Sequence, residues 1–475
     1  MKNARCTLPA AVAAMLLAST GCQDRNSPGL LAPEGPSVSQ VASNCVVTTT
    51  EDSGAGSLRE AIANASCGEI GFALAYPATI ALTTGELLIG RSVDINGPGA
   101  DRLIIARDAV DYFRVIHVEA GATVTISGVT VTAGVSYGPG GAIRNSGTMT
   151  VANSVVTRNE GTQGGGIFND GVFELVSSTL SDNDASYGGG FVNRGVARLI
   201  GSTIFGNTAW DDPGGGVFNG ANGEMTIINS TISGNQAPWD PSGGIQNYSS
   251  MVLQHSTVTG NRGRWGGGIG SGPNLLIENS IVAGNTAEQG APDIGATQLT
   301  ARYSLIGTAE SYTLADGSGN NVIAPQAVGL AALADNGGAT RTHRLLPSSP
   351  AVNAGDPAFT STTLLYDQRG QGFARVSGGR TDMGAFELQQ TPPTPADLLE
   401  ELITASAGTP GVSRGTQNKL LDARNHLSAG RTTPACNKLR EYIADVQSQS
   451  GKRINSVDAA RLIGMAREVR AAIGC

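Results

Sequence analysis

The apolar residues between positions 140 and 290 recur in a repeat of 24 to 28 residues. A glycine-rich motif begins at Gly140, Gly164, Gly188, Gly214, Ser242 and Gly266. A second motif ends in asparagine at Asn159, Asn183, Asn207, Asn235, Asn261 and Asn285. Within each repeat apolar and polar residues alternate, and this period of two predicts β-strands. Because a strand this short buries little by itself, we expect the repeats to stack as the coils of a solenoid.

Four columns of the repeat are almost wholly apolar, so we expect them to line the interior of the solenoid. They contain Val151, Leu175, Leu199, Ile227, Leu253 and Ile277; Met149, Phe173, Ala197, Met225, Met251 and Leu275; Val156, Leu180, Ile204, Ile232, Val258 and Val282; and Ile143, Ile167, Phe191, Val217, Ile245 and Ile269. The pattern predicts one parallel β-helix from about residue 80 to about residue 325.

Glycine and asparagine are expected at the corners of the coils. Glycine adopts unusual backbone angles without steric cost, and stacked side-chain amides bond to one another and to the backbone. Asn145, Asn169, Asn193, Asn219 and Asn247 form one such column. This architectural explanation is favoured over a glycine-rich phosphate loop.

The composition divides the chain into two parts. Of 475 residues 66 are glycine, and only 15% are charged. Between Cys22 and Ala396 there is no lysine, and 18 arginines stand against 31 acidic residues, a net charge of −13. Such a surface attracts nucleic-acid phosphates little, so no nucleic-acid partner is expected. Residues 397–475 carry 11 Lys and Arg against 8 Asp and Glu, and this shift after "QQTPPTP" marks a domain boundary.

The N-terminus has the features of a bacterial export signal. Lys2 and Arg5 precede the apolar run "LPAAVAAMLLAST", which is too short to span a membrane. "STGC" resembles a lipoprotein signal-peptidase site, although Ser19 stands where leucine is usual. We predict an export signal over residues 1–22, with lipidation at Cys22 or plain cleavage, and a flexible tether over residues 23–43. The protein is then exported to the outer membrane surface or beyond, and only a lipid anchor would join it to a membrane.

Four further cysteines fall into two local groups. In an oxidising compartment the natural pairing is Cys45 with Cys67 and Cys436 with Cys475. A zinc site is the alternative, but no CxxC spacing supports it, so no metal is expected.

The segment after Cys45 predicts a cap on the first coil. Ser57 and Glu60 of "GSLREAIANAS" have the spacing of a capping box. The expected buried face of this helix is Leu58, Ala61, Ile62 and Ala65.

Three stretches carry a family resemblance. "VVTTTEDSGAGSLREAI" resembles the N-terminal motif of CSLREA-type β-helix proteins, and "GGGIFN" resembles the repeats of polymorphic outer-membrane proteins. "LADNGGATRTHRLLPSSPAVNAGDP", with "DQRG" and "DMGAFE", is similar to the end segment of the same surface proteins. The resemblance covers roughly residues 45–388. It implies a right-handed parallel β-helix of the pectin lyase-like kind at the cell surface, and no agreed activity.

The tail predicts a bundle of about four helices. Pro395, Pro434 and Ser456 stand near helix starts, and Gly408, Gly430 and Gly451 near helix ends. The tail resembles the FIMAH domain of exported bacterial proteins, which implies association with a surface or a partner. The predicted organisation is a capped β-helix over residues 44–390, a linker over 391–396 and a helical bundle over 397–475.

The candidate binding residues are loop aromatics. All three tryptophans, Trp210, Trp239 and Trp265, fall in one loop of successive coils, and Tyr187 precedes them. Aromatic faces pack on sugar C–H faces, so this row predicts a platform for an extended polysaccharide. The alternative is that the rings prop one another and shield the edge of the coil.

An enzyme is the second hypothesis, because parallel β-helices host pectate lyases and polygalacturonases. A hydrolase needs paired carboxylates, and the weak candidates are Asp211, Asp212 and Asp240, with Asp184 on the same edge. A lyase would need Ca²⁺ and a base. Arg262 and Arg264 are nearby, but no motif indicates a calcium site, and no cofactor is expected.

The histidines support neither a metal site nor a catalytic set. His117, His255, His343 and His426 are scattered along the chain. His255 stands in a corner column otherwise held by Asn, Ser and Gly, which favours a structural role.

A structural spacer, or an adhesin that binds a protein, is the third hypothesis. The outward column Thr179, Thr203, Thr231 and Thr257 would be a flat, inert or weakly adhesive face. The sequence therefore favours a monomeric surface protein that binds a polysaccharide or another cell-surface component, with catalysis second.

Overall fold

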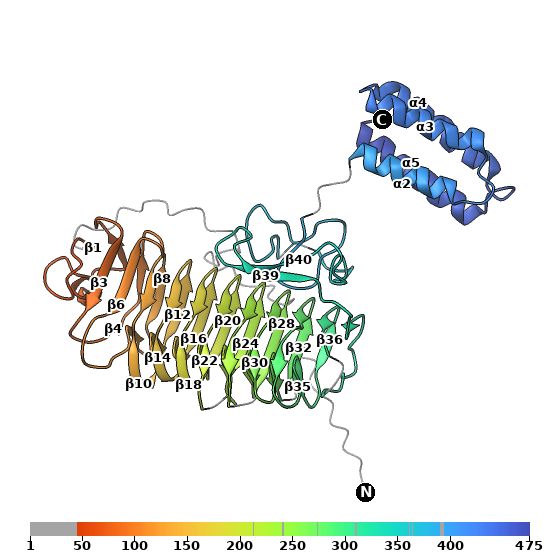
Figure 1. Ribbon diagram of the computed structural model, residues 1–475. Helices are drawn as coiled ribbons and strands as arrows, with labels where there is room; N and C mark the ends of the chain where they lie inside the picture. The colour runs from red at the N-terminus through yellow and green to blue at the C-terminus, as the bar shows by residue number, and fades with distance from the viewer. Residues whose placement is uncertain are drawn as a thin grey trace, which may run out of the picture. The chain divides into compact units, whose positions relative to one another are not determined.

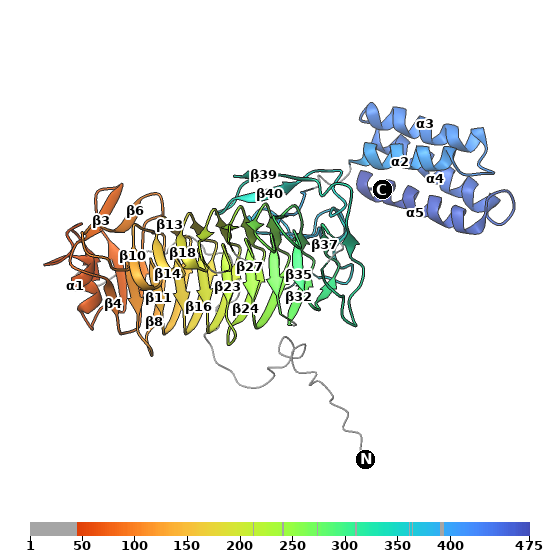
Figure 2. The same cartoon turned by 60° about the horizontal axis from the view of Figure 1, so that its bottom comes forward.

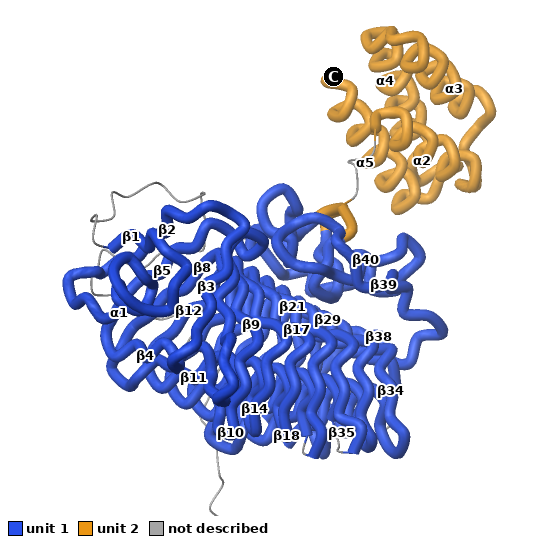
Figure 3. The backbone as a smooth tube through the Cα atoms, turned by 60° about the vertical axis from the view of Figure 1, so that its left-hand side comes forward, with its two compact units in different colours: residues 1–376, 380–387 blue, residues 377–379, 388–475 orange. Residues whose placement is uncertain are grey.

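The computed structural model describes residues 45–211, 213–239, 242–272, 274–308, 311–360, 362, 364–389 and 394–475. The chain divides into two compact units, residues 1–376 with 380–387 and residues 377–379 with 388–475 (Figure 3). The first unit is a parallel β-solenoid, whose coils follow one another from β1 to β38 (Figures 1 and 2). The described residues of the second unit form four helices. The predicted fold class, a mainly β parallel solenoid followed by a small helical bundle, is confirmed.

Four parallel sheets run along the solenoid, and each complete coil visits them in the same order. The first sheet contains β1 (Val46–Val47), β2 (Glu69–Phe72), β5 (Val93–Asn96), β8 (Thr123–Ser127), β12 (Thr148–Ala152), β16 (Val172–Val176), β20 (Val196–Ile200), β24 (Glu224–Ile228), β28 (Ser250–Gln254), β32 (Leu275–Glu278) and β36 (Thr300–Arg302). The second sheet contains β3 (Ala78–Leu82), β6 (Leu103–Arg107), β9 (Thr130–Thr132), β13 (Val155–Thr157), β17 (Thr179–Ser181), β21 (Thr203–Phe205), β25 (Thr231–Ser233), β29 (Thr257–Thr259), β33 (Ile281–Val282), β37 (Leu305–Ile306) and β38 (Val322–Ile323).

The other two sheets complete the coil. The third sheet contains β10 (Val135–Pro139), β14 (Glu160–Gln163), β18 (Asp184–Tyr187), β22 (Thr208–Ala209), β26 (Gln236–Ala237), β30 (Arg262–Gly263) and β34 (Thr286–Ala287). The fourth sheet contains β4 (Leu87–Ile89), β7 (Ile116–Val118), β11 (Ile143–Asn145), β15 (Ile167–Asn169), β19 (Phe191–Asn193), β23 (Val217–Asn219), β27 (Ile245–Asn247), β31 (Ile269–Ser271) and β35 (Ile294–Ala296).

The predicted apolar columns line the interior. Leu199, Ile227 and Leu253 are paired in register across neighbouring strands of the first sheet, and all three are fully buried. The other three columns are also buried. The predicted register is therefore confirmed, and the stacked apolar rows supply the continuous core that a single coil lacks.

The corner asparagines form two hydrogen-bonded ladders. From Asn159 to Asn261 each side-chain amide donates to the Oδ1 of the next asparagine at 2.9 Å, and the ladder ends where Asn285 donates to Asp293. The second ladder runs from Asn145 to Asn247 and ends at the hydroxyl of Ser271. Gly164, with φ of +65°, begins one glycine corner, and a Cβ there would clash with the carbonyl of Ile167. The asparagine and glycine motifs are architecture, as expected.

One residue of each coil, at the corner between the first and second sheets, has a left-handed backbone. This left-handed column is Asn153, Ser177, Gly201, Asn229, His255, Asn279 and Tyr303, with φ between 45° and 60°. In these coils the residue that follows the left-handed position is a buried serine, from Ser154 to Ser304. Its backbone N–H donates to the serine hydroxyl of the following coil, from Ser154 to Ser304.

The N-terminal cap contains α1 (Leu58–Ala63). The Ser57 hydroxyl accepts from the Glu60 backbone N–H, but the Glu60 carboxylate accepts from the N–H of Gly56 rather than of Ser57. Leu58, Ala61 and Ile62 are buried, whereas Ala65 lies beyond the helix and is exposed. The capping box is thus half formed, and the predicted helical face was wrong at Ala65 because the helix ends two residues earlier.

The predicted open threonine face was wrong. The strap, defined as residues 329–376 and 380–387 and including β39 (Leu330–Ala334) and β40 (Thr342–Leu345), covers part of the second sheet. Thr203 donates to the carbonyl of Arg341 at 2.6 Å, and Thr231 donates to Gln368 at 2.6 Å. Thr203, Thr231 and Thr257 are buried, and only Thr179 remains partly exposed. Short hydroxyl side chains let a second layer approach and supply its hydrogen bonds.

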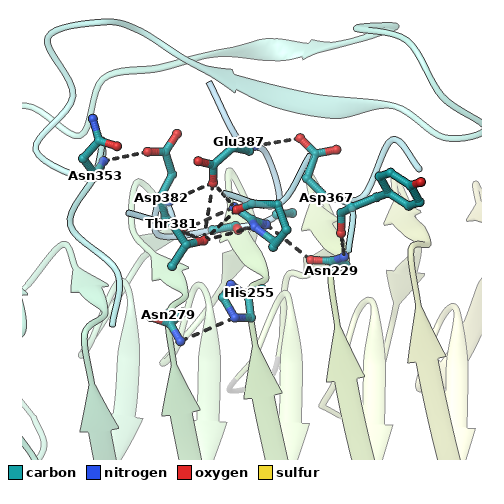
Figure 4. A network of polar contacts seen from close by, with 12 residues as sticks. Asn229, His255, Asn279, Asn353, Asp367, Thr381, Asp382 and Glu387 are labelled. Atoms are coloured by element: carbon teal, nitrogen blue, oxygen red, sulfur yellow. Dashed lines mark hydrogen bonds and ion pairs between the residues drawn. The ribbon is translucent and has the colours of Figure 1, made fainter. Parts of the chain in front are cut away.

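The strap has a buried polar centre. Arg375 and Glu387 form an ion pair at 2.8 Å, and both side chains are fully buried. Arg369 pairs with Asp367 at 2.6 Å, and its guanidinium lies 3.9 Å from the Phe373 ring centroid. Figure 4 shows Glu387 and Asp367 facing this network from the strap and Asn229 from the solenoid.

The helical unit contains α2 (Pro395–Ala407), α3 (Arg414–Ser428), α4 (Thr432–Gln449) and α5 (Ser456–Ile473). The disulfides Cys45–Cys67 and Cys436–Cys475 are both formed, which confirms the predicted pairing. No helix among the described residues has the length and apolar character needed to cross a membrane. The predicted export signal, the tether and Cys22 lie outside the described residues.

Candidate functional site

The three tryptophans follow successive strands of the third sheet, where the chain turns toward the fourth. Trp210 comes directly after β22, Trp239 two residues after β26, and Trp265 two residues after β30. Their exposed fractions are 51%, 65% and 49%. We call this set of three residues the tryptophan edge.

The register of the tryptophan edge is not uniform. Ala185 pairs with Ala209, and Ala237 pairs with Gly263. Trp239 lies two residues after Ala237, and Trp265 lies two residues after Gly263. Trp210 lies only one residue after Ala209. Trp210 is therefore offset by one residue from the register that Trp239 and Trp265 share.

Backbone hydrogen bonds fix the chain at the tryptophan edge, while the indole rings remain exposed to solvent. The N–H of Trp210 donates to Ala185, and the carbonyl of Trp265 accepts from Ala291. The guanidinium of Arg264 lies 5.7 Å from the Trp265 ring centroid. Among the described residues, no ring–ring contact joins a tryptophan to another aromatic side chain. The rings therefore do not prop one another, as the shielding alternative requires.

Tyr187 belongs to a different aromatic group. Its ring centroid lies 5.2 Å from that of Phe218, whose centroid lies 5.6 Å from that of Tyr248. The Tyr187 hydroxyl accepts from Arg194 at 2.9 Å. Together with Pro213 these residues line a groove of about 330 Å³ beside the loop that carries Trp210. Tyr187 thus adjoins the tryptophan edge instead of extending it as a fourth free ring.

The acidic candidates on this edge are only partly described. Asp211 is exposed, and Asp212 and Asp240 lie outside the described residues. The pKa of Asp184 is raised, first by burial and then by the nearby carboxylates Glu160 and Asp182, against a lowering hydrogen bond from Thr208. A hydrolytic carboxylate pair at this edge stays a prediction.

The basic and histidine candidates have mainly structural partners. Arg262 pairs with Glu288 at 2.7 Å. His117 lies 3.0 Å from Glu86, and His343 lies 2.8 Å from the Ser233 hydroxyl beneath the strap. No cluster of three His, Cys, Asp or Glu that could hold a metal occurs in the part of the chain that the structure describes.

A second cleft, which the sequence did not indicate, lies at the left-handed column. Its volume is about 340 Å³, and one wall is strap residues Asp356 and Phe359. The solenoid contributes Arg198, Ile228, Gln254, His255, Glu278, Asn279, Arg302 and Tyr303. The available signal was the pair of rings, His255 and Tyr303, in a column of small and amide side chains. The strap that completes the cleft carries no repeat and could not be placed from the pattern.

Comparison with protein-family models, with curated proteins and with solved structures finds no match for this chain. The CSLREA-type and FIMAH assignments therefore stay predictions. What the structure establishes is the parallel β-solenoid, the two disulfides and the helical unit.

Proposed function

We propose that this protein is an exported surface protein that binds an extended polysaccharide along the tryptophan edge. The fold is consistent with surface binding or with a polysaccharide-related function. The observation that supports the binding hypothesis is the half-exposed state of Trp210, Trp239 and Trp265 on successive coils. Large aromatic rings open to water cost free energy in a soluble protein, and in rows they are typical of recognition surfaces.

The spacing also supports a linear ligand. Neighbouring strands of a parallel sheet lie about 4.8 Å apart, so the three loops repeat at close to the spacing of sugar units in an extended glycan. Arg264 and Asp211 supply charged groups beside the rings for hydroxyl hydrogen bonds.

The finer parts of the proposal concern location and family. We propose export through the signal over residues 1–22, attachment or release at Cys22, and membership of the CSLREA-type β-helix proteins with a FIMAH-like tail. Mass spectrometry of the native N-terminus tests the export step. A mature protein that still begins at Met1 would contradict it.

A glycan-array screen of the full mature chain tests the binding function. Each stacked ring should contribute on the order of 1 kcal/mol or more, so Trp210→Ala/Trp239→Ala should weaken binding at least tenfold. Tyr112→Ala is the matched control, because Tyr112 is a 56% exposed aromatic outside the tryptophan edge. If wild type binds no polysaccharide, or the double variant binds as tightly as wild type, the platform hypothesis is wrong.

The alternative of a lyase or hydrolase has its own readout in the same screen. Release of unsaturated or reducing sugar ends would move the assignment to catalysis around Asp211, Asp212 and Asp240. A third outcome, binding of a protein with no glycan binding, would favour the adhesin hypothesis.

A further inference from the structure

The cleft beside His255 supports an inference beyond binding at the tryptophan edge. The cleft lies at the corner between the first and second sheets, whereas the tryptophan edge lies between the third and fourth. Its volume of about 340 Å³ is at the lower end of the range for ligand pockets, about 300–1,000 Å³. The two places are separate, so each can be tested without the other.

The residue choice in the left-handed column marks the cleft. Gly adopts a left-handed backbone most readily, Asn, Asp and His follow, and a bulky residue such as Tyr does so rarely. Asn, Ser and Gly fill the column except at two positions. Those positions are His255, with φ of 45°, and Tyr303, with φ of 48°, and both line the cleft. Bulky rings kept at strained positions are more frequent at functional sites than elsewhere.

His255 presents an unused polar atom. Its side chain is buried, and its Nε2 lies 3.4 Å from Nδ2 of Asn279 (Figure 4). Its ring centroid lies 4.5 Å from that of Phe359. Nδ1 is buried and has no hydrogen-bond partner among the described residues. Burial, and after it the positive charge of Arg375, lower the pKa of His255 well below its usual value. The ring is therefore neutral near pH 7 and offers one donor and one acceptor.

The rest of the lining combines apolar side chains, Ile228 and Leu364, with polar groups whose charges balance. Gln254 donates to Glu278 at 2.8 Å, and Arg302 donates to Glu278 at 3.3 Å. Two arginines, Arg198 and Arg302, stand against two carboxylates, Glu278 and Asp356, so the formal charge is 2 − 2 = 0 with His255 neutral. An anion or a cation gains little from such a lining. Convergent hydrogen-bonding groups beside aromatic walls instead suit an uncharged, polyhydroxylated ring.

We propose that the cleft binds a neutral sugar unit, with hydroxyl hydrogen bonds to Nδ1 of His255 and to the Gln254–Glu278 pair and with the sugar ring against the aromatic wall of Phe359 and Tyr303. The ligand is one or two units long, because the strap closes one side of the cleft. The site is distinct from the polysaccharide platform and does not depend on it.

Histidine-selective NMR of the full chain tests this proposal. The chain has only four histidines, so ring ¹⁵N labelling gives few signals, and His255→Asn identifies those of His255. The probes are glucose, galactose, mannose and N-acetylglucosamine, with their common disaccharides. At least one should shift the His255 ring signals while those of His117 and His343 stay in place. His255→Asn should weaken that binding at least tenfold, and asparagine keeps the left-handed backbone because neighbouring coils use it.

Two further variants keep the test decisive. Gln254→Leu removes a hydrogen-bonding group without touching the ring stack on Phe359, so it carries the test if His255→Asn loosens the strap. Trp210→Ala/Trp239→Ala should leave this binding within twofold, whatever it does to polysaccharide binding. The proposal is overturned if no sugar moves the His255 signals, or if both cleft variants bind the sugar as tightly as wild type.

Discussion

The buried ion pair of the strap gives a prediction with a defined magnitude. The Arg375 side chain donates to Glu387 at 2.8 Å, to the Gly384 carbonyl at 3.0 Å and to Asn229 of the solenoid at 3.3 Å. Arg375→Met keeps much of the volume but leaves the Glu387 carboxylate buried without its counter-charge. Removing one partner of a buried ion pair typically costs about 3–5 kcal/mol.

This cost should appear as local opening of the strap. At about 1.4 kcal/mol per factor of ten, the open state should become about 10² to about 4 × 10³ times more populated. Hydrogen exchange with mass spectrometry measures it on peptides that cover residues 380–387. There the N–H of Gly384 donates to the Asn279 carbonyl and that of Ala385 to the Thr257 hydroxyl. Amides in the solenoid interior should keep their protection.

Two variants control the result. Arg344→Met removes an exposed arginine of the same segment and should change exchange by less than about 0.5 kcal/mol. Arg375→Met/Glu387→Met removes both members of this ion pair, so neither is left buried alone, and it should recover much of the loss. If Arg375→Met exchanges at the wild-type rate, the ion pair does not hold the strap and the reasoning fails.

Three further predictions concern the solenoid. Ile227→Asp should bury an unpaired charge and lower the free energy of unfolding by more than about 4 kcal/mol, whereas Thr226→Asp on the outer face should not. Equal melting temperatures of the two variants, measured by circular dichroism, would disprove the register. Asn207→Ala removes the amide that bonds to Asn235 and should cost about 1–3 kcal/mol in urea denaturation; an unchanged midpoint would argue against the ladder as a stabilising element. Burial alone would raise the pKa of Asp52, but hydrogen bonds from Thr84, Arg59 and Thr83 outweigh it and lower the pKa to about 2. Because the pKa of this carboxyl is lower in the folded than in the unfolded state, its stabilisation is present above about pH 4 and is lost as the pH falls toward 2. Asp52→Asn should therefore make the free energy of unfolding depend less on pH in that window. An unchanged pH dependence would contradict the assignment.

The sequence determined the solenoid because its determinants are local and repeated. Alternation within five residues selects a strand, and the recurrence at 24 to 28 residues places like residues in register. Leu199, Ile227 and Leu253 therefore had to stack, and each corner asparagine meets its copy in the next coil until the ladders end at Asp293 and Ser271. The disulfides were equally local, with sequence separations of 22 and 39 residues between the partners.

The tertiary structure decided everything that depends on a segment without a repeat. The threonine column resembled an open face because its partners, Arg341 and Gln368, lie more than 130 residues away and show no periodicity. The one-residue offset of Trp210 depends on where each loop leaves its strand. The cleft at His255 forms between two parts of the chain. The repeat supplies the left-handed corner, and the strap supplies Phe359. A repeat specifies contacts between copies of itself, and contacts between a repeat and a unique segment form only once the chain has folded back.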